Sequence, residues 1–235
     1  MAAPDPIEAD RIRQVYDRYD QKGWAESKWA DTNPGNARNL QERERRIGGL
    51  LVETGYAPLA GRRLLEIGCG SGKVMRSLLR LGARPENCYG VDLIPDRIGE
   101  AQAACPGVHF QTANAEQLPF ETGSFHLVAV FTVFSSILDD ATARRIAGEM
   151  DRVLKPGGAV IWYDLRVNNP GNPNVRGLRP PELARLFPEY RPRLCKLTLV
   201  PPLARRLGSL TGTLYPILVA MPLLRTHLGG VLMKP

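Results

Sequence analysis

The strongest constraint on this fold is a regular alternation of short apolar runs and helical stretches between residues 63 and 165. Five runs have the length and composition of strands: RLLEIG, NCYGVDL, VHFQTA, FHLVAVFTVF and AVIWYDL. Helical patterns lie between them in KVMRSLLRLG, PDRIGEAQAAC and DDATARRIAGEMDRVL. Strands that alternate with helices form a mainly parallel sheet covered on both faces. We therefore predict an α/β, Rossmann-like fold.

The rest of the chain extends this core. Its 235 residues are enough for one sizeable core, so we predict a single structural domain. Residues 1–60 carry two helical patterns and predict an N-terminal helical cap, while residues 61–235 hold the sheet. The expected elements after the fifth strand are a polar loop region at 165–192, the strand RLCKLTLV, a helical insert at 201–225 and the antiparallel last strand HLGGVLM, which completes seven strands.

Composition narrows the class of protein. The start of the chain lacks the apolar stretch of a signal peptide, and the four cysteines form no CxxC pair. We therefore expect a reduced, cytoplasmic protein without a structural metal. The net charge of +7 invites a nucleic-acid partner, but the arginines alternate with acids in stretches such as ERERRIGG, which is typical of solvated helix faces.

An uncharged run of eighteen residues, 207–224, lies at the lower limit for a membrane-spanning helix. It contains Pro216 and Pro222, which predict breaks in a helical pair. We expect this pair to be buried or to form an interface, including a homodimer contact, and not to span a membrane. Attachment to a membrane surface stays open as an alternative.

The segment LLEIGCGSGKV, residues 64–74, joins the first strand to the next helix. A Walker A loop would need Ser or Thr at Val74 and Gly at Ile67, and a dinucleotide fingerprint would need Gly at Lys73. The remaining pattern is E-x-G-x-G-x-G, in which glycines permit positive φ and close approach of a ligand to the backbone.

This loop resembles the first motif of the class I S-adenosylmethionine-dependent methyltransferases. Four further segments match that family in order: YGVDL with Asp92, ANAEQLPF at 113–120, SFHLVAVFTVF and LKPGGAVIWYD. The resemblance covers about residues 60 to 165. It implies that the chain binds S-adenosyl-L-methionine and releases S-adenosyl-L-homocysteine.

The resemblance also assigns roles to residues at the donor site. It implies that Asp92 accepts the ribose hydroxyls, and that Asn114, where the family has Asp, accepts from the adenine amino group. Arg38 is the candidate for the donor carboxylate, and aromatic residues of the cap are candidates to line the site. The expected cofactor-binding residues are Glu66, Gly68, Cys69, Gly70, Gly72, Asp92, Leu93, Asn114, Ala115, Glu116, Phe131, Thr132, Arg38 and Tyr19, with Tyr16, Trp24 and Trp29 beside them.

The acceptor leaves a weaker signature, because methyl transfer from a sulfonium depends mainly on positioning. The region after the fourth strand lacks a [DN]-P-P-[YFW] motif, a nucleophilic Cys and a pair of Glu, which sets aside three classes of macromolecule methyltransferase. The Asn-rich loop and the apolar insert resemble parts of bacterial glycan and secondary-metabolite enzymes. We therefore predict O-methylation of a sugar or glycoside hydroxyl, free or lipid-linked.

Candidate residues for the acceptor follow the fifth strand: Asn168, Asn169, Asn172, Asn174 and Arg176. Candidate general bases are Asp139, Asp140, Tyr163, Asp164 and His227, although Asp139 and Asp140 also suit the start of the next helix. Three alternatives stay open: N- or C-methylation of another secondary metabolite, RNA methylation, and a non-catalytic cofactor-binding subunit that supports a partner.

Overall fold

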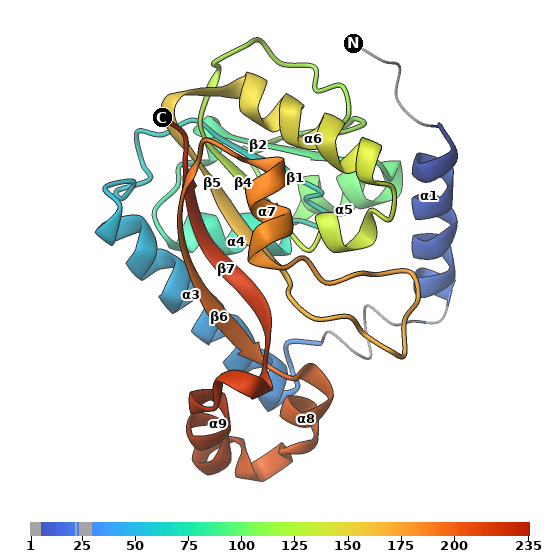
Figure 1. The fold of residues 1–235 in the computed structure, drawn as a ribbon, viewed down its shortest axis with the longest axis vertical. Helices are drawn as coiled ribbons and strands as arrows, with labels where there is room; N and C mark the ends of the chain where they lie inside the picture. The colour runs from blue at the N-terminus through green and yellow to red at the C-terminus, as the bar shows by residue number, and fades with distance from the viewer. Residues whose placement is uncertain (1–5, 22, 24–29) are drawn as a thin grey trace.

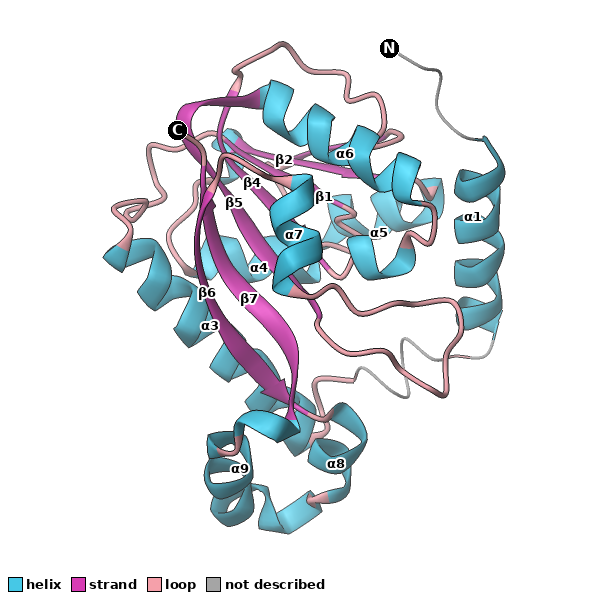
Figure 2. Ribbon diagram, in the orientation of Figure 1, coloured by secondary structure: helices cyan, strands magenta, loops and turns pink. Residues whose placement is uncertain are grey.

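The computed structural model describes residues 6–21, 23 and 30–235, and these fold around one seven-stranded sheet (Figures 1 and 2). The strand order is β3-β2-β1-β4-β5-β7-β6. Only β7 runs antiparallel to its neighbours β5 and β6, which confirms the predicted sheet and its antiparallel last strand. The strands are β1 (Leu64–Ile67), β2 (Cys88–Asp92), β3 (His109–Thr112), β4 (Phe125–Phe131), β5 (Leu154–Leu165), β6 (Arg191–Leu199) and β7 (Arg225–Met233).

Strand β5 begins earlier than its sequence suggests. The sequence predicts the fifth strand at AVIWYDL, residues 159–165, but Leu154 already pairs with Phe125 of β4. The register then shifts between Phe125 and Leu127, so the extra residues form a bulge within the ladder. The strand stays buried from Gly158 to Asp164, as expected for an interior strand covered on both faces.

Helices cover both faces of the sheet. On one face, α3 (Pro34–Glu53), α4 (Lys73–Arg80) and α5 (Pro95–Ala104) contribute Ile47, Leu78 and Ile98 to one apolar cluster. On the other face lie α6 (Asp140–Val153) and α7 (Pro180–Leu186). Helix α3, predicted as part of a cap, is therefore one layer of the domain, because Ile47 and Leu51 are fully buried against the sheet side.

Helix α1 (Pro6–Gln21) lies at the side of the sheet that carries the glycine loop, next to α5 and α6 (Figure 1). Leu138 N donates to Glu8 Oε1 at 2.7 Å, and Arg11 donates to the Ser136 carbonyl at 2.5 Å. The Arg97 guanidinium of α5 lies 4.4 Å from the Tyr16 ring centroid. These contacts hold α1 between α5 and the segment after β4. Trp24 and Trp29 lie outside the described residues.

Residues 201–224 form a projecting unit between β6 and β7, here called the C-terminal lobe (Figure 1). It consists of α8 (Pro201–Arg206), η3 (Gly208–Leu210), α9 (Thr211–Ala220) and η4 (Pro222–Leu224). The predicted helical insert is present, but the break expected at Pro216 is wrong, because α9 continues through it to Ala220. Strand β6 runs parallel to β1, so the lobe leaves the sheet at the same edge as the glycine loop.

Across the described parts of the chain, none of the helices has the length and apolar character needed to cross a membrane.

Candidate active site

The glycine loop between β1 and α4 has the backbone that its sequence requires. Gly68, Gly70 and Gly72 have φ values of +68°, +50° and +78°, a region that side chains rarely occupy. A Cβ on Gly68 would lie 2.5 Å from Cγ2 of Val133, whereas a Cβ on Gly70 would meet no atom within 4 Å. The loop is therefore packed against the protein at Gly68 and open toward a ligand at Gly70.

Asp92 ends β2 and holds this loop in place. Gly70 N donates to Asp92 Oδ2 at 2.8 Å, and Ile94 N donates to Oδ1 at 3.0 Å. A carboxylate offers about four acceptor positions, so two remain for hydroxyl groups of a ligand. The half-buried Asp92 is thus placed as the ribose role requires.

Glu66, just before the glycine loop, is a buried carboxyl with an oxygen left unpartnered by the described residues. Its side chain is 1% exposed, and Oε2 has no hydrogen-bond partner among the described residues. Burial, followed by the charge of Asp92, raises the pKa of Glu66 well above its usual value. A buried carboxyl oxygen without a partner is unfavourable, and the ammonium group of an amino-acid ligand would satisfy it. The residues present therefore fit the predicted donor.

Cys69 and Leu93 flank these acids. Cys69 is buried, its N–H donates to the Val91 carbonyl, and burial raises the pKa of its thiol, so it is no nucleophile. Leu93 is half-buried directly after Asp92. Cys69 and Leu93 can contact a ligand through backbone or apolar surface, not through charge.

The segment predicted to bind adenine, residues 113–120, is held by hydrogen bonds and an ion pair of its own residues. Glu116 N donates to Asn114 Oδ1 at 2.9 Å, so the Asn114 carbonyl already shapes its own turn. Glu116 is buried and pairs with Arg145 of α6, whose Nε lies 2.6 Å from Oε2. Glu116 therefore anchors the segment to α6, and the half-buried Asn114 and Ala115 are the groups left for a ligand.

An aromatic column follows the carboxyl ends of β4 and β5. The rings of Phe131 and Tyr163 stack with centroids 5.6 Å apart, and Tyr163 stacks on His227 at 4.7 Å. Thr132, the next residue along the chain, has φ +54° and donates its N–H to the Tyr163 carbonyl at 2.7 Å. That positive φ turns the chain away from the strand and leaves Thr132 exposed at the site.

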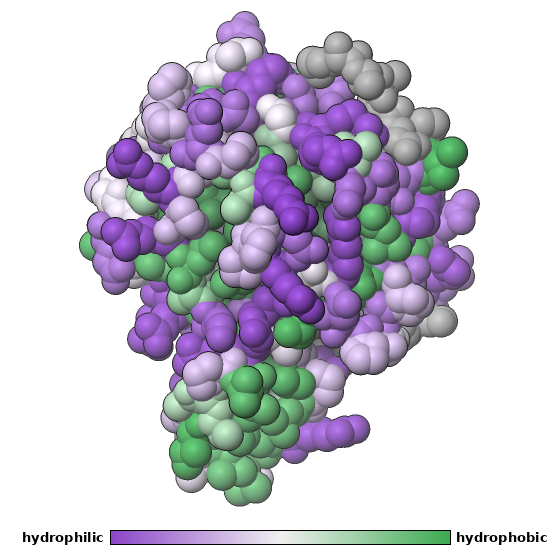
Figure 3. All heavy atoms as spheres, viewed as in Figure 1, coloured by the Kyte–Doolittle hydropathy of each residue, from purple (hydrophilic) through white to green (hydrophobic). Residues whose placement is uncertain are grey.

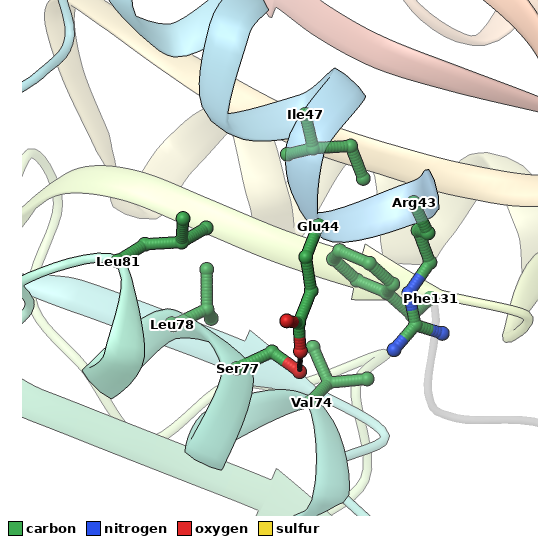
Figure 4. A pocket seen from close by; sticks show the side chains of 8 residues that line it. All are labelled: Arg43, Glu44, Ile47, Val74, Ser77, Leu78, Leu81 and Phe131. Carbon is green, nitrogen blue, oxygen red and sulfur yellow. Dashed lines mark hydrogen bonds between the residues drawn. The ribbon is translucent and has the colours of Figure 1, made fainter. Parts of the chain in front are cut away.

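Arg43 of α3, which was not among the predicted site residues, places a positive charge beside this aromatic column. Its guanidinium carbon lies 5.2 Å and 5.1 Å from the centroids of Phe131 and Tyr163. Figure 4 shows Arg43 pointing toward Phe131 in a small pocket between α3 and α4, whereas its neighbour Glu44 turns to Ser77. The positive charge of Arg43 lowers the pKa of Glu66 and so opposes the effect of burial.

Arg43 suits a carboxylate ligand better than the predicted Arg38. Arg38 is exposed and donates to Gln41. Arg43 is half-buried and forms no ion pair within the part of the chain that the structure describes. The sequence held a signal for it, because Arg43 precedes the buried Ile47 and Leu51 at intervals of four and so shares their helix face.

Two of the predicted bases have structural partners. Asp139 is the N-cap of α6 and accepts from the N–H groups of Ala141 and Thr142, which holds the pKa of its carboxyl below the usual value. Asp140 is exposed and accepts from Arg176 Nη1 at 2.5 Å. The structure therefore joins a candidate base, Asp140, to a candidate acceptor residue, Arg176.

Two further candidate bases are buried. The Tyr163 hydroxyl shares a hydrogen bond of 2.6 Å with Thr198 Oγ1, and burial raises the pKa of Tyr163 to about 12. Asp164 accepts from the N–H groups of Ser135 and Leu165 at 3.1 Å and 2.7 Å, and burial raises its pKa to about 6. Asp164 thus fixes the turn after β4 that borders the site.

His227, the fifth candidate, is buried against Tyr163, and burial lowers its pKa to about 3. An unfolded His titrates near 6.5, so between pH 6.5 and 3 the unfolded chain binds a proton that the folded chain does not. Acidification therefore destabilises the fold through this residue. Between pH 7.5 and 4.5, the unfolding free energy of the wild type should fall by about 2 to 3 kcal/mol more than that of His227→Phe. The phenylalanine keeps the ring stack but cannot titrate. Denaturant unfolding of both proteins at the two pH values measures this, and equal losses would refute it.

The Asn-rich loop after β5 is held largely by its own side chains. Asn168 and Asn169 accept from loop N–H groups, and Asn174 N donates to Asn172 Oδ1 at 3.1 Å. Asn172 also exchanges hydrogen bonds with the Tyr19 hydroxyl of α1, at 2.9 and 3.1 Å. Tyr19, predicted to bind the methyl donor, and Asn172, predicted to bind the methyl acceptor, are therefore in contact where α1 meets the loop.

Comparisons with known proteins agree with this geometry. A family model described as a methyltransferase domain matches residues 65–162. The chain is 37% identical over 113 residues to a phthiotriol/phenolphthiotriol dimycocerosates methyltransferase of Mycobacterium leprae, covering 47% of this chain and 40% of that protein. It is 31% identical over 120 residues to a ubiquinone biosynthesis O-methyltransferase of Paracidovorax citrulli, covering 48% of each. These matches span about half, or less, of the relatives' length.

Solved structures share the fold over more of the chain. A 1,6-didemethyltoxoflavin-N1-methyltransferase of Burkholderia thailandensis, solved with S-adenosylhomocysteine, superposes with a TM-score of 0.65 at 17% identity, covering 100% of this chain and 91% of that one. A SAM-dependent methyltransferase of Methanosarcina mazei gives 0.57 at 21% identity, covering 78% and 96%. Residues 65–162 therefore match a methyltransferase domain, and the sheet around them shares the fold of solved S-adenosylmethionine-dependent methyltransferases.

Proposed function

We propose that the chain transfers a methyl group from S-adenosyl-L-methionine to a hydroxyl oxygen of an amphipathic acceptor, with a sugar hydroxyl on a lipid-linked glycan as the first candidate. This proposal rests on the two segments that lie beside the donor site, one polar and one apolar. A polar loop that reaches α1 through Asn172 and the apolar C-terminal lobe both lie at the edge of the sheet that carries the glycine loop.

The names of two relatives support oxygen as the methylated atom and an apolar molecule as the acceptor. One relative is named as an O-methyltransferase of ubiquinone biosynthesis, and the other acts on phthiotriol and phenolphthiotriol dimycocerosates. The first name gives a pathway and transfer to oxygen, and the second gives acceptor molecules; we extend to this chain only the general chemistry of a hydroxyl on an apolar molecule. The four cysteines are free, which is compatible with the cytoplasmic location that we also propose.

In the proposed mechanism the chain acts mainly by positioning. When bound, the donor supplies a methyl group on a sulfonium, so the reaction needs an acceptor oxygen held in line with it. The glycine loop and Asp92 hold the donor, Arg43 binds its carboxylate, and the stacked rings of Phe131 and Tyr163 form an apolar wall beside it. The hydroxyl proton is released to solvent as the new C–O bond forms, because the candidate bases are committed to the partners described above.

A transfer assay with labelled donor tests the proposed function. The purified chain is incubated with donor carrying a carbon-13 methyl group and a detergent-dispersed lipid extract of the source cells. We expect label in the organic phase, with the carbon-13 chemical shift of a methyl ether and loss of the product with Asp92→Ala. Label at nitrogen or carbon, label only in RNA or protein, or donor binding without any transfer would each contradict the proposal.

A further inference from the structure

The net charge of the protein is concentrated at one end of the chain. Residues 191–235 contain seven Lys and Arg and no Asp or Glu, whereas residues 1–190 contain 24 basic and 24 acidic residues. We expected acidic residues to balance the arginines along the whole chain. This holds for the first 190 residues and is wrong for the remainder. At the C-terminal lobe, the exposed Lys196 and Arg206 are joined by the half-buried Arg205 and Arg225.

The same lobe exposes apolar side chains. Leu210, Ile217, Met221 and Leu223 are 57%, 61%, 50% and 88% exposed, and they are half of the exposed large apolar residues in the described chain. Figure 3 shows the apolar surface gathered on the projecting lobe at the lower end of the molecule. Such clustering on a soluble surface marks an interaction site, whereas single exposed apolar residues are ordinary.

The C-terminal lobe has a packed core of its own, so its exposed apolar residues are not core residues of the lobe. Leu199, Ala204, Leu207 and Tyr215 form a separate small core inside it. The Tyr215 hydroxyl donates to Asn39 Oδ1 of α3 at 2.8 Å. A packed inner face and an apolar outer face indicate that a partner covers the outside.

We propose that the C-terminal lobe docks on the surface of an anionic lipid bilayer. Its apolar side chains would enter the interface between head groups and acyl chains, while the cations contact the lipid phosphates. Charge complementarity favours this occupant over a second copy of the chain, because residues 191–235 hold no Asp or Glu and a symmetric contact between two lobes would bring like charges together. Glu42, which accepts a hydrogen bond from the Tyr215 hydroxyl, is buried and not available at the outer surface.

Docking would place the methyl-transfer site beside the membrane. Asn39 Nδ2 of α3 donates to the Leu199 carbonyl at 3.2 Å, and Thr198 N donates to Glu42 Oε2 at 3.1 Å. These bonds tie the base of the lobe to α3 next to Arg43, whose guanidinium lies over the Phe131 and Tyr163 rings. The link to an acceptor rests on the proposed function, but membrane binding itself requires no turnover.

Vesicle co-sedimentation of the full chain tests the proposal. The vesicles are phosphatidylcholine alone and phosphatidylcholine mixed with phosphatidylglycerol. We expect the wild type to bind the anionic vesicles and Ile217→Ser/Leu223→Ser to lower its partition coefficient by about tenfold or more. Lys196→Glu/Arg206→Glu should remove the preference for anionic vesicles.

Val52→Ser is the matched control, since Val52 is 68% exposed on α3, away from the lobe, and should leave binding unchanged. Unchanged affinity for S-adenosyl-L-homocysteine shows that each variant is folded. The proposal is overturned if the wild type does not sediment with anionic vesicles at physiological salt, or if the double serine variant binds as well as the wild type. It is also overturned if sedimentation velocity shows a dimer that the serine variant dissociates without loss of vesicle binding. Vesicle binding without methyl transfer would refute only the proposed function.

Discussion

Replacing Asp92 by Asn is expected to weaken the binding of S-adenosyl-L-homocysteine by about 100-fold or more. The carboxylate accepts from Gly70 N and Ile94 N, and we assign its remaining acceptor positions to the ribose hydroxyls. The amide keeps one acceptor oxygen but loses the charge and the second acceptor. Two charge-assisted hydrogen bonds at about 1.5 to 3 kcal/mol each account for a change of this size. Isothermal titration calorimetry measures it directly.

The neighbouring Asp96 offers a matched control for this substitution. Asp96 lies in the first turn of α5 and is exposed, so Asp96→Asn should leave the dissociation constant within about twofold. A melting temperature measured without ligand separates loss of binding from loss of folding. If Asp92→Asn binds the product as tightly as the control, the assignment of Asp92 to the ribose is wrong.

Replacing Arg43 by Met is expected to weaken product binding by about 10- to 100-fold, which corresponds to one buried charge-assisted pair. Methionine keeps an apolar stem over Phe131 and Tyr163 and removes only the guanidinium. Arg38→Met is the matched variant, because Arg38 is exposed on the same helix. We expect it to have no effect on the same titration.

Methylthioadenosine sharpens this test, since it keeps the nucleoside and the sulfur but lacks the amino-acid carboxylate. If Arg43 binds that carboxylate, Arg43→Met should leave the affinity for methylthioadenosine unchanged. Equal losses for both ligands would instead mean that Arg43 supports the aromatic wall and does not contact the donor.

The donor half of the site could be predicted because its determinants are local. Each strand end carries its own polar residue or glycine within a few positions, so the motif at Gly68 and the acid at Asp92 can be recognised before folding. Parallel strands then bring their carboxyl ends to one edge by rule. The pattern predicts a mainly parallel sheet, whereas the strand order and the pairing partners of β7 come from the structure.

The rest of the site arises from contacts between distant segments. Arg43, Phe131, Tyr163 and His227 lie on four different elements, and only the packing of α3 and β7 brings them into one column. The hydrogen bonds within the polar loop were also hidden from the sequence. Its Asn residues suggested a binding surface, but several of them hold their own loop, because short amides bond nearby backbone more readily than distant ligands.

The position of β7 has a consequence for how the protein is made. It is the last strand of the sheet to leave the ribosome, yet it pairs with β5 on one side and with β6 on the other. Until residues 225–233 emerge, the nascent chain exposes the open edge of β5, and β6 has no strand to pair with. His227, which completes the aromatic column, arrives with the same strand. The aromatic column is therefore completed only after residues 225–233 are made, which makes the insertion of β7 between β5 and β6 a late, long-range step of folding.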